Sequence, residues 1–279
     1  MKSINLKYLF RSRSFKFMMN KDARSHSLEK YIWNGQPVYY RTSTSDMTLI
    51  YEVLLKSGYK SEYYLPADFN PKVILDIGAN IGITSIYLIN KFPNAKIFSF
   101  EPLLENYDIL KKNTENYKNI KVFNFGLGKK DETLDIYLSD DSENFGGGSF
   151  FPEVGGTSNR KVKCEIKNIQ DTLVELDMKE VDLIKIDTEG AEFDILTSLN
   201  KKYLKSVKWI TGELHGYKDF ELLDYLQGFG FNIGIKKQIN NRLFMFHAIN
   251  NKTLETLNKQ DIKRLVKWKL VPSHLSKMD

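Results

Sequence analysis

Residues 73–85 read Val73-Ile-Leu-Asp-Ile-Gly-Ala-Asn-Ile-Gly-Ile-Thr-Ser85, and residues 96–102 read Lys96-Ile-Phe-Ser-Phe-Glu-Pro102. The first stretch is an apolar run around Asp76 that continues through a glycine turn into an amphipathic segment. The second stretch is an apolar run that ends on Glu101. Two strands separated by a helical segment in this order are typical of a βαβ unit. We therefore expect a βαβ unit whose turn and strand ends hold a nucleoside.

The glycine turn distinguishes two classes of cofactor that share this architecture. A dinucleotide site follows the pattern Gly-x-Gly-x-x-Gly, in which the second glycine lets the backbone approach the pyrophosphate. Here Gly78-Ala-Asn-Ile-Gly82 places the side chain of Asn80 between its two glycines. S-Adenosylmethionine has no phosphate, so its amino-acid end can lie beside a turn that carries side chains and offers amide donors. The turn therefore favours S-adenosylmethionine over a nicotinamide dinucleotide.

Acids at the ends of the two strands are placed to bind the polar parts of such a cofactor. We expect Asp76 to receive its ammonium group, directly or through water, and Glu101 to accept hydrogen bonds from both ribose hydroxyls. Asn124, at the end of a third strand, is expected to line the adenine, although a strand-end turn also explains the glycines beside it. The residues expected to bind the cofactor are Asp76, Gly78, Asn80, Gly82, Glu101, Pro102 and Asn124.

The composition fits one α/β domain with appendages. The chain has 279 residues, of which 42% are hydrophobic, and is too short for two full enzyme domains. Its single cysteine, Cys164, excludes an internal disulfide framework and suits a reducing compartment. No apolar run reaches a membrane-spanning length, and residues 1–20 carry scattered charges instead of the apolar core of a signal peptide. We expect a cytoplasmic protein.

The net charge of +6 is concentrated at the two ends of the chain. Residues 7–16 and 259–270 are rich in Lys and Arg, and the second segment places its apolar residues on one helical face. These are Ile262, Leu265, Val266 and Leu270. Such a helix either docks on the domain or contacts a membrane surface or a second subunit. We expect no nucleic-acid partner, and we consider peripheral contact with the inner membrane face through the basic termini. The oligomeric state stays open.

The chain divides into three parts. We expect residues 1–70 to form an N-terminal cap, 71–250 an α/β domain with a mostly parallel sheet and an antiparallel C-terminal hairpin, and 251–279 a basic amphipathic helix. In the cap, a helical pattern over 47–56 follows Asp46, which we expect to be its N-cap. The pattern predicts strands at 72–76, 96–100, 121–125, 133–138, 161–166, 182–187, 207–214, 231–235 and 243–249, and helices at 82–91, 103–116, 191–199 and 220–228.

The motifs of the α/β domain together resemble the FkbM family of S-adenosylmethionine-dependent methyltransferases. The matching elements are Leu75-Asp-Ile-Gly-Ala-Asn-Ile-Gly82, Phe100-Glu-Pro102, Gly147–Ser149, Ile184-Lys-Ile-Asp-Thr-Glu-Gly-Ala-Glu192 and Gly212-Glu213. The resemblance covers about residues 40 to 250 and includes the upstream segment Arg41–Asp46. It implies a Rossmann-like class I methyltransferase fold, S-adenosylmethionine as cofactor, and O-methylation of a hydroxyl, commonly on a sugar of a polysaccharide, glycolipid or secondary metabolite.

One element departs from the pattern of that family. Such proteins often have Thr-Leu-Asp ahead of the Lys-Ile-Asp strand, whereas this chain reads Cys164-Glu-Ile166. We therefore carry no role of that aspartate over to this chain, although Glu165 lies close to its position.

The carboxyl ends of the later strands hold the candidates for catalysis. Methyl transfer from a sulfonium is an in-line displacement, and a sugar hydroxyl needs a base within hydrogen-bond reach. Because ligands bind at the carboxyl ends of parallel strands, the candidates are Asp187, Glu189, Glu213 and His215. We expect Asp187 to bind or deprotonate the acceptor, with an N-cap as the alternative. His215 would be a natural base because its ordinary pKa is near neutrality, with a hydrogen-bonding bystander as the alternative.

Three further residues are expected to contact the acceptor. Ser149 lies in a glycine-rich loop that can present amides or act as a gate. Glu189 shares the turn of Asp187, and Arg41 precedes the domain, where it could instead pair with Asp46.

No metal is expected at the site. Asp187, Glu189 and Glu213 offer hard oxygen ligands that magnesium would accept, but no His/Cys cluster supports zinc.

Three other functions compete with sugar O-methylation. The basic termini suggest N-methylation of RNA or of a protein amine, but Asp187-Thr-Glu-Gly stands where many base-methylating enzymes have Asn-Pro-Pro-Tyr or Asp-Pro-Pro-Tyr. A nicotinamide-dependent oxidoreductase is weakened by Asn80. A non-catalytic binding module would keep the cofactor as a structural ligand.

Overall fold

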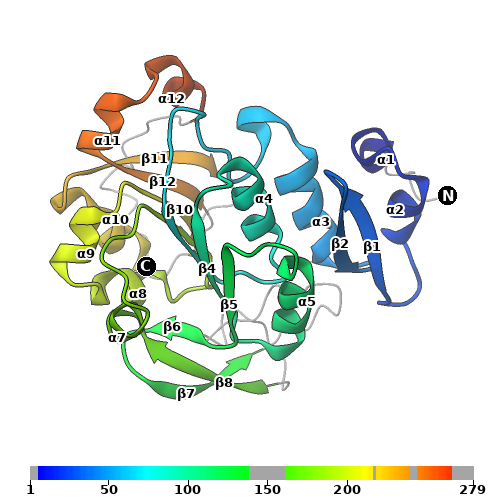
Figure 1. Ribbon diagram of the computed structural model, residues 1–279, viewed down its shortest axis with the longest axis horizontal. Helices are drawn as coiled ribbons and strands as arrows, with labels where there is room; N and C mark the ends of the chain where they lie inside the picture. Colours follow the sequence, from blue (N-terminus) through cyan, green and yellow to red (C-terminus); the bar gives the residue numbers. More distant parts are fainter. Residues whose placement is uncertain (1–5, 138–160, 216–217, 239–243, 266–279) are drawn as a thin grey trace.

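The computed structural model describes residues 6–137, 161–215, 218–238 and 244–265. Its centre is a seven-stranded sheet with the strand order β11-β12-β10-β9-β3-β4-β5 (Figure 1). The parallel strands are β3 (Val73–Ile77), β4 (Lys96–Phe100), β5 (Ile120–Phe123), β9 (Leu183–Ile186) and β10 (Trp209–Leu214). The antiparallel strands are β12 (Phe244–Asn250), which pairs with β10, and β11 (Phe231–Gln238), which pairs with β12. The expected mostly parallel sheet with an antiparallel C-terminal hairpin is confirmed.

Helices cover both faces of this sheet. Neighbouring residues of β3 point to opposite faces, so Ile74 packs in one core cluster with Leu88 and Leu75 packs in another with Ile195. The first face carries α4 (Ile83–Lys91) and α5 (Leu104–Thr114). The second face carries α7 (Ile169–Glu175), α8 (Glu192–Ser198), α9 (Lys201–Ser206) and α10 (Asp219–Gly228). Burial on both faces explains why the central strands are apolar almost throughout.

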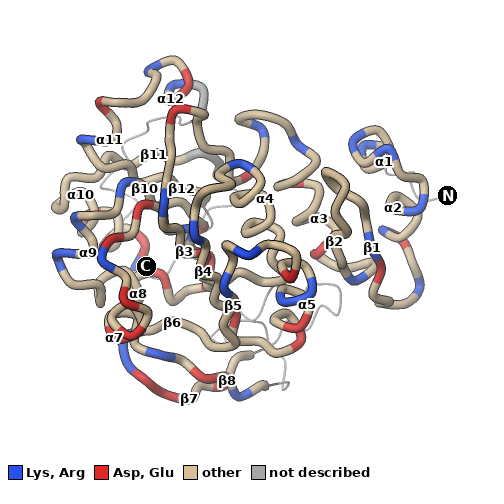
Figure 2. Tube along the Cα trace, viewed as in Figure 1, with Lys and Arg blue, Asp and Glu red and all other residues tan. Residues whose placement is uncertain are grey.

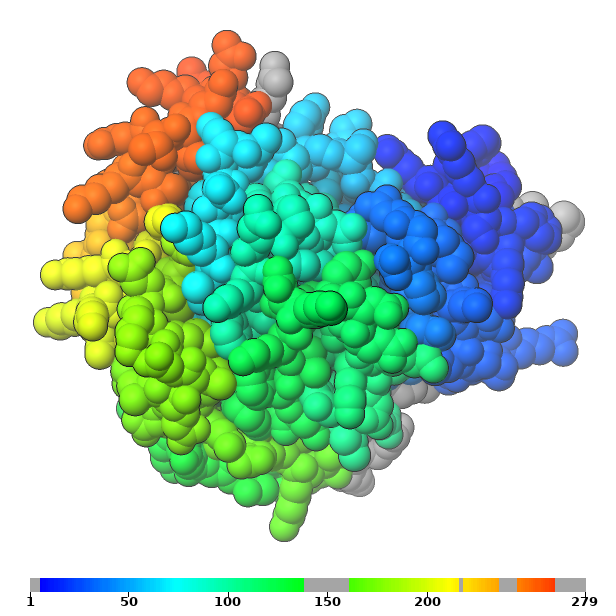
Figure 3. Space-filling model, in the orientation of Figure 1, coloured from blue at the N-terminus to red at the C-terminus, as the bar shows by residue number. Residues whose placement is uncertain are grey.

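The N-terminal region forms a lobe at one end of the molecule (Figure 3). Its elements are α1 (Leu6–Ser12), α2 (Phe15–Asn20), β1 (Leu28–Trp33), β2 (Gln36–Arg41), α3 (Ser45–Leu49), the π-helical η1 (Ile50–Leu55) and the 3₁₀ turn η2 (Gly58–Lys60). Aromatic rings hold the lobe together, with the Phe17 ring centroid 5.2 Å from that of Tyr40. Asn113 of α5 joins the lobe to the domain, because its side chain pairs with both backbone groups of Tyr39 at 2.6 and 3.0 Å.

The start of the helical segment in this lobe differs from the prediction. Thr44, not Asp46, is the N-cap of α3, and its Oγ1 accepts from the Asp46 amide at 3.2 Å. Asp46 is unavailable as a cap because Arg41 occupies its carboxylate. The expected helix over 47–56 is divided between α3 and η1.

Two smaller units complete the fold. The expected accessory strands lie in a separate sheet of order β6-β8-β7, formed by β6 (Gly126–Gly128), β7 (Glu132–Tyr137) and β8 (Lys161–Asn168). At the C-terminal end, α11 (Asn251–Thr256) and α12 (Lys259–Leu265) follow the hairpin. Ile262 of α12 packs in the cluster of Trp209, whereas the side chains of Leu265, Val266 and Leu270 lie outside the described part. None of the described helices is long and apolar enough to cross a bilayer.

Replacing Gly212 with Ala should destabilise the sheet by about 3 kcal/mol, because overpacking against backbone leaves nothing free to move aside. A Cβ atom at Gly212 would lie 1.8 Å from the carbonyl oxygen of Ile186 on the neighbouring strand. Urea denaturation followed by circular dichroism measures the free energy of unfolding. Gly228→Ala is the matched control, since its Cβ would meet no atom within 4 Å. Equal stability of the two variants would contradict the strand contact.

Candidate active site

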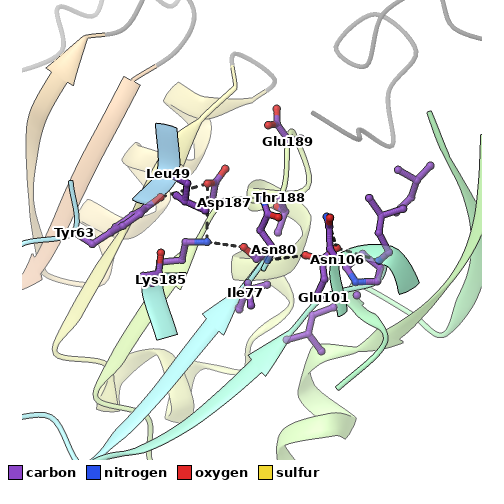
Figure 4. A pocket seen from close by; sticks show the side chains of 18 residues that line it. Leu49, Tyr63, Ile77, Asn80, Glu101, Asn106, Lys185, Asp187, Thr188 and Glu189 are labelled. Carbon is purple, nitrogen blue, oxygen red and sulfur yellow. Dashed lines mark hydrogen bonds and ion pairs between the residues drawn. The ribbon is translucent and has the colours of Figure 1, made fainter. Parts of the chain in front are cut away.

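A cavity opens at the carboxyl ends of β3, β4 and β9 (Figure 4). The turns that follow these strands contribute residues 78–80, 101–103 and 187–189 to its wall. The other lining residues are Leu49, Tyr63, Ile77, Thr84, Asn106, Gly126, Leu127, Ile136 and Lys185. The cavity and its open mouth together, including the solvent in the mouth, hold about 780 Å³. The site therefore lies where the sequence predicted it, at the ligand edge of a parallel sheet.

The glycine turn after β3 is fixed by its neighbours. Gly78, Asn80 and Gly82 adopt positive φ angles of 73°, 50° and 85°. The Gly78 amide donates to the carbonyl oxygen of Phe100 at 3.1 Å. A Cβ atom at Gly78 would lie 1.9 Å from the carbonyl oxygen of Asp187. Only glycine therefore lets the turn after β3 touch the turn after β9.

Glu101 is buried in the wall and is held by three donors. Its carboxylate accepts from the backbone amides of Asn80 at 2.8 Å and Leu103 at 3.0 Å, and from the Asn106 side chain at 3.4 Å. Burial raises the pKa of Glu101, and these hydrogen bonds and Lys185 oppose the rise. A carboxylate has about four acceptor sites, so with these three donors about one site remains for a hydroxyl group of a ligand. The position suits the ribose contact that was expected of Glu101.

Arg41 supports this wall from behind. Its Nε and Nη2 donate to Asp46 at 2.8 and 2.9 Å, and Nη2 also donates to Oδ1 of Asn106 at 2.8 Å. The Arg41 side chain is buried and does not line the cavity. Arg41 was expected to contact the acceptor. In this structure its guanidinium donates to Asp46 and Asn106, and Asn106 in turn donates to Glu101, so Arg41 supports the cavity wall.

The side chain of Asn80 indicates that a polar ligand belongs in the cavity. Asn80 lines the wall, and its buried Oδ1 has no hydrogen-bond partner among the described residues. A buried acceptor without a donor costs free energy, so such atoms usually serve a purpose. An ammonium or hydroxyl group of a bound molecule would satisfy it.

Lys185 is a site residue that the sequence analysis did not identify. Its Nζ lies 3.3 Å from Oδ1 of Asp76 and 4.0 Å from Oδ2 of Asp187, and it donates to the carbonyl oxygen of Gly78 at 2.6 Å. Burial lowers the pKa of Lys185, but Asp76 and Asp187 outweigh this and raise it, so the side chain is a cation. A lysine between two isoleucines of a buried strand was the available signal.

Asp76 is consequently not on the cavity wall. It is fully buried, its Oδ2 accepts from Ser85 Oγ at 2.5 Å, and its other oxygen faces Lys185. Lys185 is the cation beside Asp76, and the expected contact of Asp76 with a cofactor ammonium, directly or through water, stays a prediction.

Asp187 receives a hydrogen bond from the N-terminal region. The hydroxyl of Tyr63 donates to Oδ2 of Asp187 at 3.3 Å. Burial, followed by the charge of Asp187, raises the pKa of Tyr63 well above its ordinary value, so Tyr63 remains a neutral donor. Tyr63 was not singled out from the sequence, since nothing in its local pattern connects it to a residue 124 positions later.

Four carboxylates surround His215. Its Nε2 lies 3.2 Å from Glu189, 3.7 Å from Asp187 and 3.9 Å from Glu213, and its Nδ1 lies 3.1 Å from Glu192. Burial lowers the pKa of His215, but these neighbours, led by Glu192, raise it to about 10. His215 is thus an imidazolium at neutral pH, and the premise that its pKa is near neutrality is corrected.

The carboxyl groups of this cluster have different pKa values. Burial raises the pKa of Glu189 to about 7 and that of Glu213 to about 8. Burial acts in the same direction on Glu192, but the hydrogen bond with His215 keeps the pKa of Glu192 below its ordinary value. Glu192 also accepts from the amides of Thr188 and Gly190 at 2.8 and 3.0 Å, and so fixes the turn after β9.

The cluster also contains the side chains that could hold a metal. Within the described ranges, Asp187, Glu213 and His215 form the only group of three potential ligands, with their ligand atoms within 4.8 Å of one another. The two carboxylates suit magnesium or manganese, whereas the imidazole suits zinc or iron, and a metal bound by His215 must displace its proton. That no metal is needed stays a prediction.

The remaining predicted residues have separate locations. Pro102 lines the cavity, and Gly82 begins α4 as its N-cap. Asn124 is not among the residues that line the described cavity, and its expected contact with the adenine stays a prediction. Its side-chain amide donates to the carbonyl oxygens of Glu101 and Pro102 at 3.1 and 3.2 Å, so it braces their turn. Ser149 lies outside the described residues.

The sequence model of the FkbM methyltransferase domain matches residues 76–233, more than half of the chain. The chain belongs to the FkbM methyltransferase family. The match begins in β3 and ends in β11, so it contains the glycine turn, Glu101 and the His215 cluster. The observed sheet is accordingly the Rossmann-like class I methyltransferase fold that the resemblance implied.

Several curated proteins are similar to this chain. Methyltransferase sdnD of Sordaria araneosa is 28% identical over 63% of this chain and 77% of its own length. The AMB antimetabolite synthetase AmbE of Pseudomonas aeruginosa is 27% identical over 62% of this chain, and the match spans a tenth of that protein. The 2-O-methyltransferase NoeI of Sinorhizobium fredii is 25% identical over 54% of this chain and 65% of its own length. Methyltransferase FkbM from Methylobacillus flagellatus, a crystal structure, gives a TM-score of 0.47 at 17% identity, over 70% of this chain and 48% of that chain.

Glu192→Gln should lower the pKa of His215 by roughly one unit or more, because an adjacent negative charge favours the imidazolium and its removal favours the neutral ring. A pH titration of the imidazole resonances by ¹H–¹⁵N NMR measures this pKa, with the exposed His26 as internal reference. An unchanged pKa of His215 would show that Glu192 does not govern its charge.

Proposed function

We propose that this FkbM protein is an S-adenosylmethionine-dependent O-methyltransferase that acts on a hydroxyl of a sugar-bearing acceptor. The proposal rests on the side chains that line the cavity. Glu101, with spare acceptor capacity, and the unpartnered Oδ1 of Asn80 line the same space as Asp187 and Glu189. One end can therefore bind a nucleoside, and the other can receive a proton.

The residues of the chain would divide the reaction between them. When bound, S-adenosylmethionine supplies an activated methyl group on its sulfonium. Glu101 would accept from a ribose hydroxyl, and Asn80 Oδ1 from a donor of the cofactor. Asp187, held by Tyr63 and Lys185, would orient the acceptor hydroxyl. A carboxylate of the His215 cluster would accept the proton that this hydroxyl loses when its oxygen takes the methyl group.

Two arguments support a sugar hydroxyl as the acceptor, one from hydrogen bonding and one from a similar protein. Carboxylates that line an open cavity accept hydrogen bonds from hydroxyl groups, which sugars offer in number. NoeI, whose name specifies 2-O-methylation, supports transfer to oxygen. A cationic amine is the second candidate, because the carboxylates around His215 would attract it. The same carboxylates disfavour RNA, since its phosphates carry like charge.

Calorimetric titration should show that wild type binds S-adenosylmethionine and S-adenosylhomocysteine but not NADH. Glu101→Gln should weaken both affinities by roughly tenfold or more, because hydrogen bonds to a charged group are lost. Glu105→Gln, exposed on α5, is the control and should bind as wild type does. Binding of NADH alone would favour an oxidoreductase. Cofactor binding without transfer to glycan, amine or RNA acceptors would favour a binding module.

The value of kcat/KM should rise as pH increases from about 7 to about 8, because Glu189 and Glu213 lose their protons over that range and become bases. Glu189→Gln should move the remaining rise to lower pH, since the charge of Glu189 helps to raise the pKa of Glu213. A rate that falls over this range would instead indicate a group that must remain protonated. Steady-state assays in constant-ionic-strength buffers distinguish these outcomes.

A further inference from the structure

The first two helices expose an apolar surface that nothing in the site requires. We define the α1–α2 surface by Leu6 and Phe10 on α1 and Phe15 and Met19 on α2, each pair four residues apart. Phe10 is 75% exposed and Phe15 66%, and the other two side chains are more than half exposed. Six of the ten exposed large hydrophobic side chains of the described residues fall within residues 6–32. The N-terminal lobe therefore concentrates exposed apolar area.

These helices are firmly docked on their other sides. The Tyr8 ring centroid lies 4.8 Å from that of Tyr51, and Phe17 lies between Tyr31 and Tyr40 at 5.0 and 5.2 Å. The exposed residues are thus a second apolar face on helices that already contribute to a core. A helix that is apolar on two faces implies a second apolar contact.

The charge around this surface is mostly positive, and of its cations Lys16 is paired with Glu29 of β1 at 2.7 Å. Residues 6–21 contain Lys7, Arg11, Arg13, Lys16 and Lys21 and no acid (Figure 2). Residues 1–41 contain nine Lys and Arg and two acids, a net charge of +7, so the rest of the chain is net −1. This lobe therefore carries a strong positive excess, as does the segment 259–270 at the other end of the chain. Its partner should be anionic.

We propose that the α1–α2 surface docks this protein on an anionic lipid bilayer. Apolar side chains with aromatic rings can enter the boundary between headgroups and acyl chains, while adjacent cations contact the headgroups. A nucleic-acid duplex would satisfy the charge, but its stacked bases would offer no apolar contact to Leu6, Phe10, Phe15 and Met19. A second copy of this chain would bring like charges together. The bilayer accommodates both features and would bring the cavity to membrane-associated acceptors.

Vesicle flotation of the full chain tests this proposal without reference to methyl transfer. Wild type should float with phosphatidylcholine vesicles that contain phosphatidylglycerol, and roughly tenfold less with phosphatidylcholine alone or in high salt. Phe10→Ser combined with Phe15→Ser should reduce flotation by a similar factor. Arg11→Gln combined with Arg13→Gln should lower the fraction of protein that floats and make that fraction less sensitive to salt, because two cations that contact the headgroups are lost. Val174→Ser, at a 62% exposed site on α7, is the matched control and should behave as wild type.

Folding and assembly are checked in the same samples. Circular dichroism and calorimetric binding of S-adenosylmethionine should be equal in wild type and the Phe10/Phe15 variant, because that surface lies outside the cavity. Absence of flotation by folded wild type, or undiminished flotation of this variant, would overturn the proposal. So would a wild-type dimer that the variant converts to a monomer in sedimentation, since the surface would then be a subunit interface.

Discussion

The site depends on the contact between two backbone turns. Gly78 approaches the carbonyl oxygen of Asp187 so closely that no β-carbon fits between them. Lys185 secures this contact because it donates to the Gly78 carbonyl while it faces Asp76 and Asp187. The turn after β3, for which we propose cofactor binding, and the turn after β9, for which we propose acceptor binding, are thereby fixed relative to each other. Such fixed spacing is what an in-line displacement requires of a protein.

The two ends of the cavity differ in their electrostatics. Glu101 keeps acceptor capacity because backbone amides satisfy only part of its carboxylate. At the other end, one imidazole is shared among several carboxylates, so His215 is held as a cation while the pKa values of Glu189 and Glu213 rise toward neutrality. Under the proposed function, removal of a proton from the acceptor would therefore belong to this group of side chains and not to a single residue.

The N-terminal lobe contributes to the site at two levels. Leu49 and Tyr63 line the cavity directly, and Arg41 reaches Glu101 through Asn106. The outer helices of the same lobe carry the basic and apolar surface for which we propose a bilayer as partner. A single lobe that completes the cavity and contacts a membrane would couple acceptor location to acceptor binding. The C-terminal helix has a different role where it is described, because Ile262 packs into the core.

The sequence by itself determined the sheet and its antiparallel end, because periodic apolar runs and glycine turns act through local sterics. Its motifs also indicated the family and the edge of the sheet at which the site lies. Five of the residues that it assigned to ligand binding or catalysis line one cavity, namely Gly78, Asn80, Glu101, Asp187 and Glu189, and their roles stay predictions. Only the tertiary structure decided which charges meet. Asp76 is engaged by Lys185, Arg41 by Asp46 and Asn106, and Tyr63 by Asp187, and these partners lie on different elements. The charge of His215 was likewise undetermined, because a pKa depends on the distance and burial of neighbouring charges, which a linear spacing of residues does not specify.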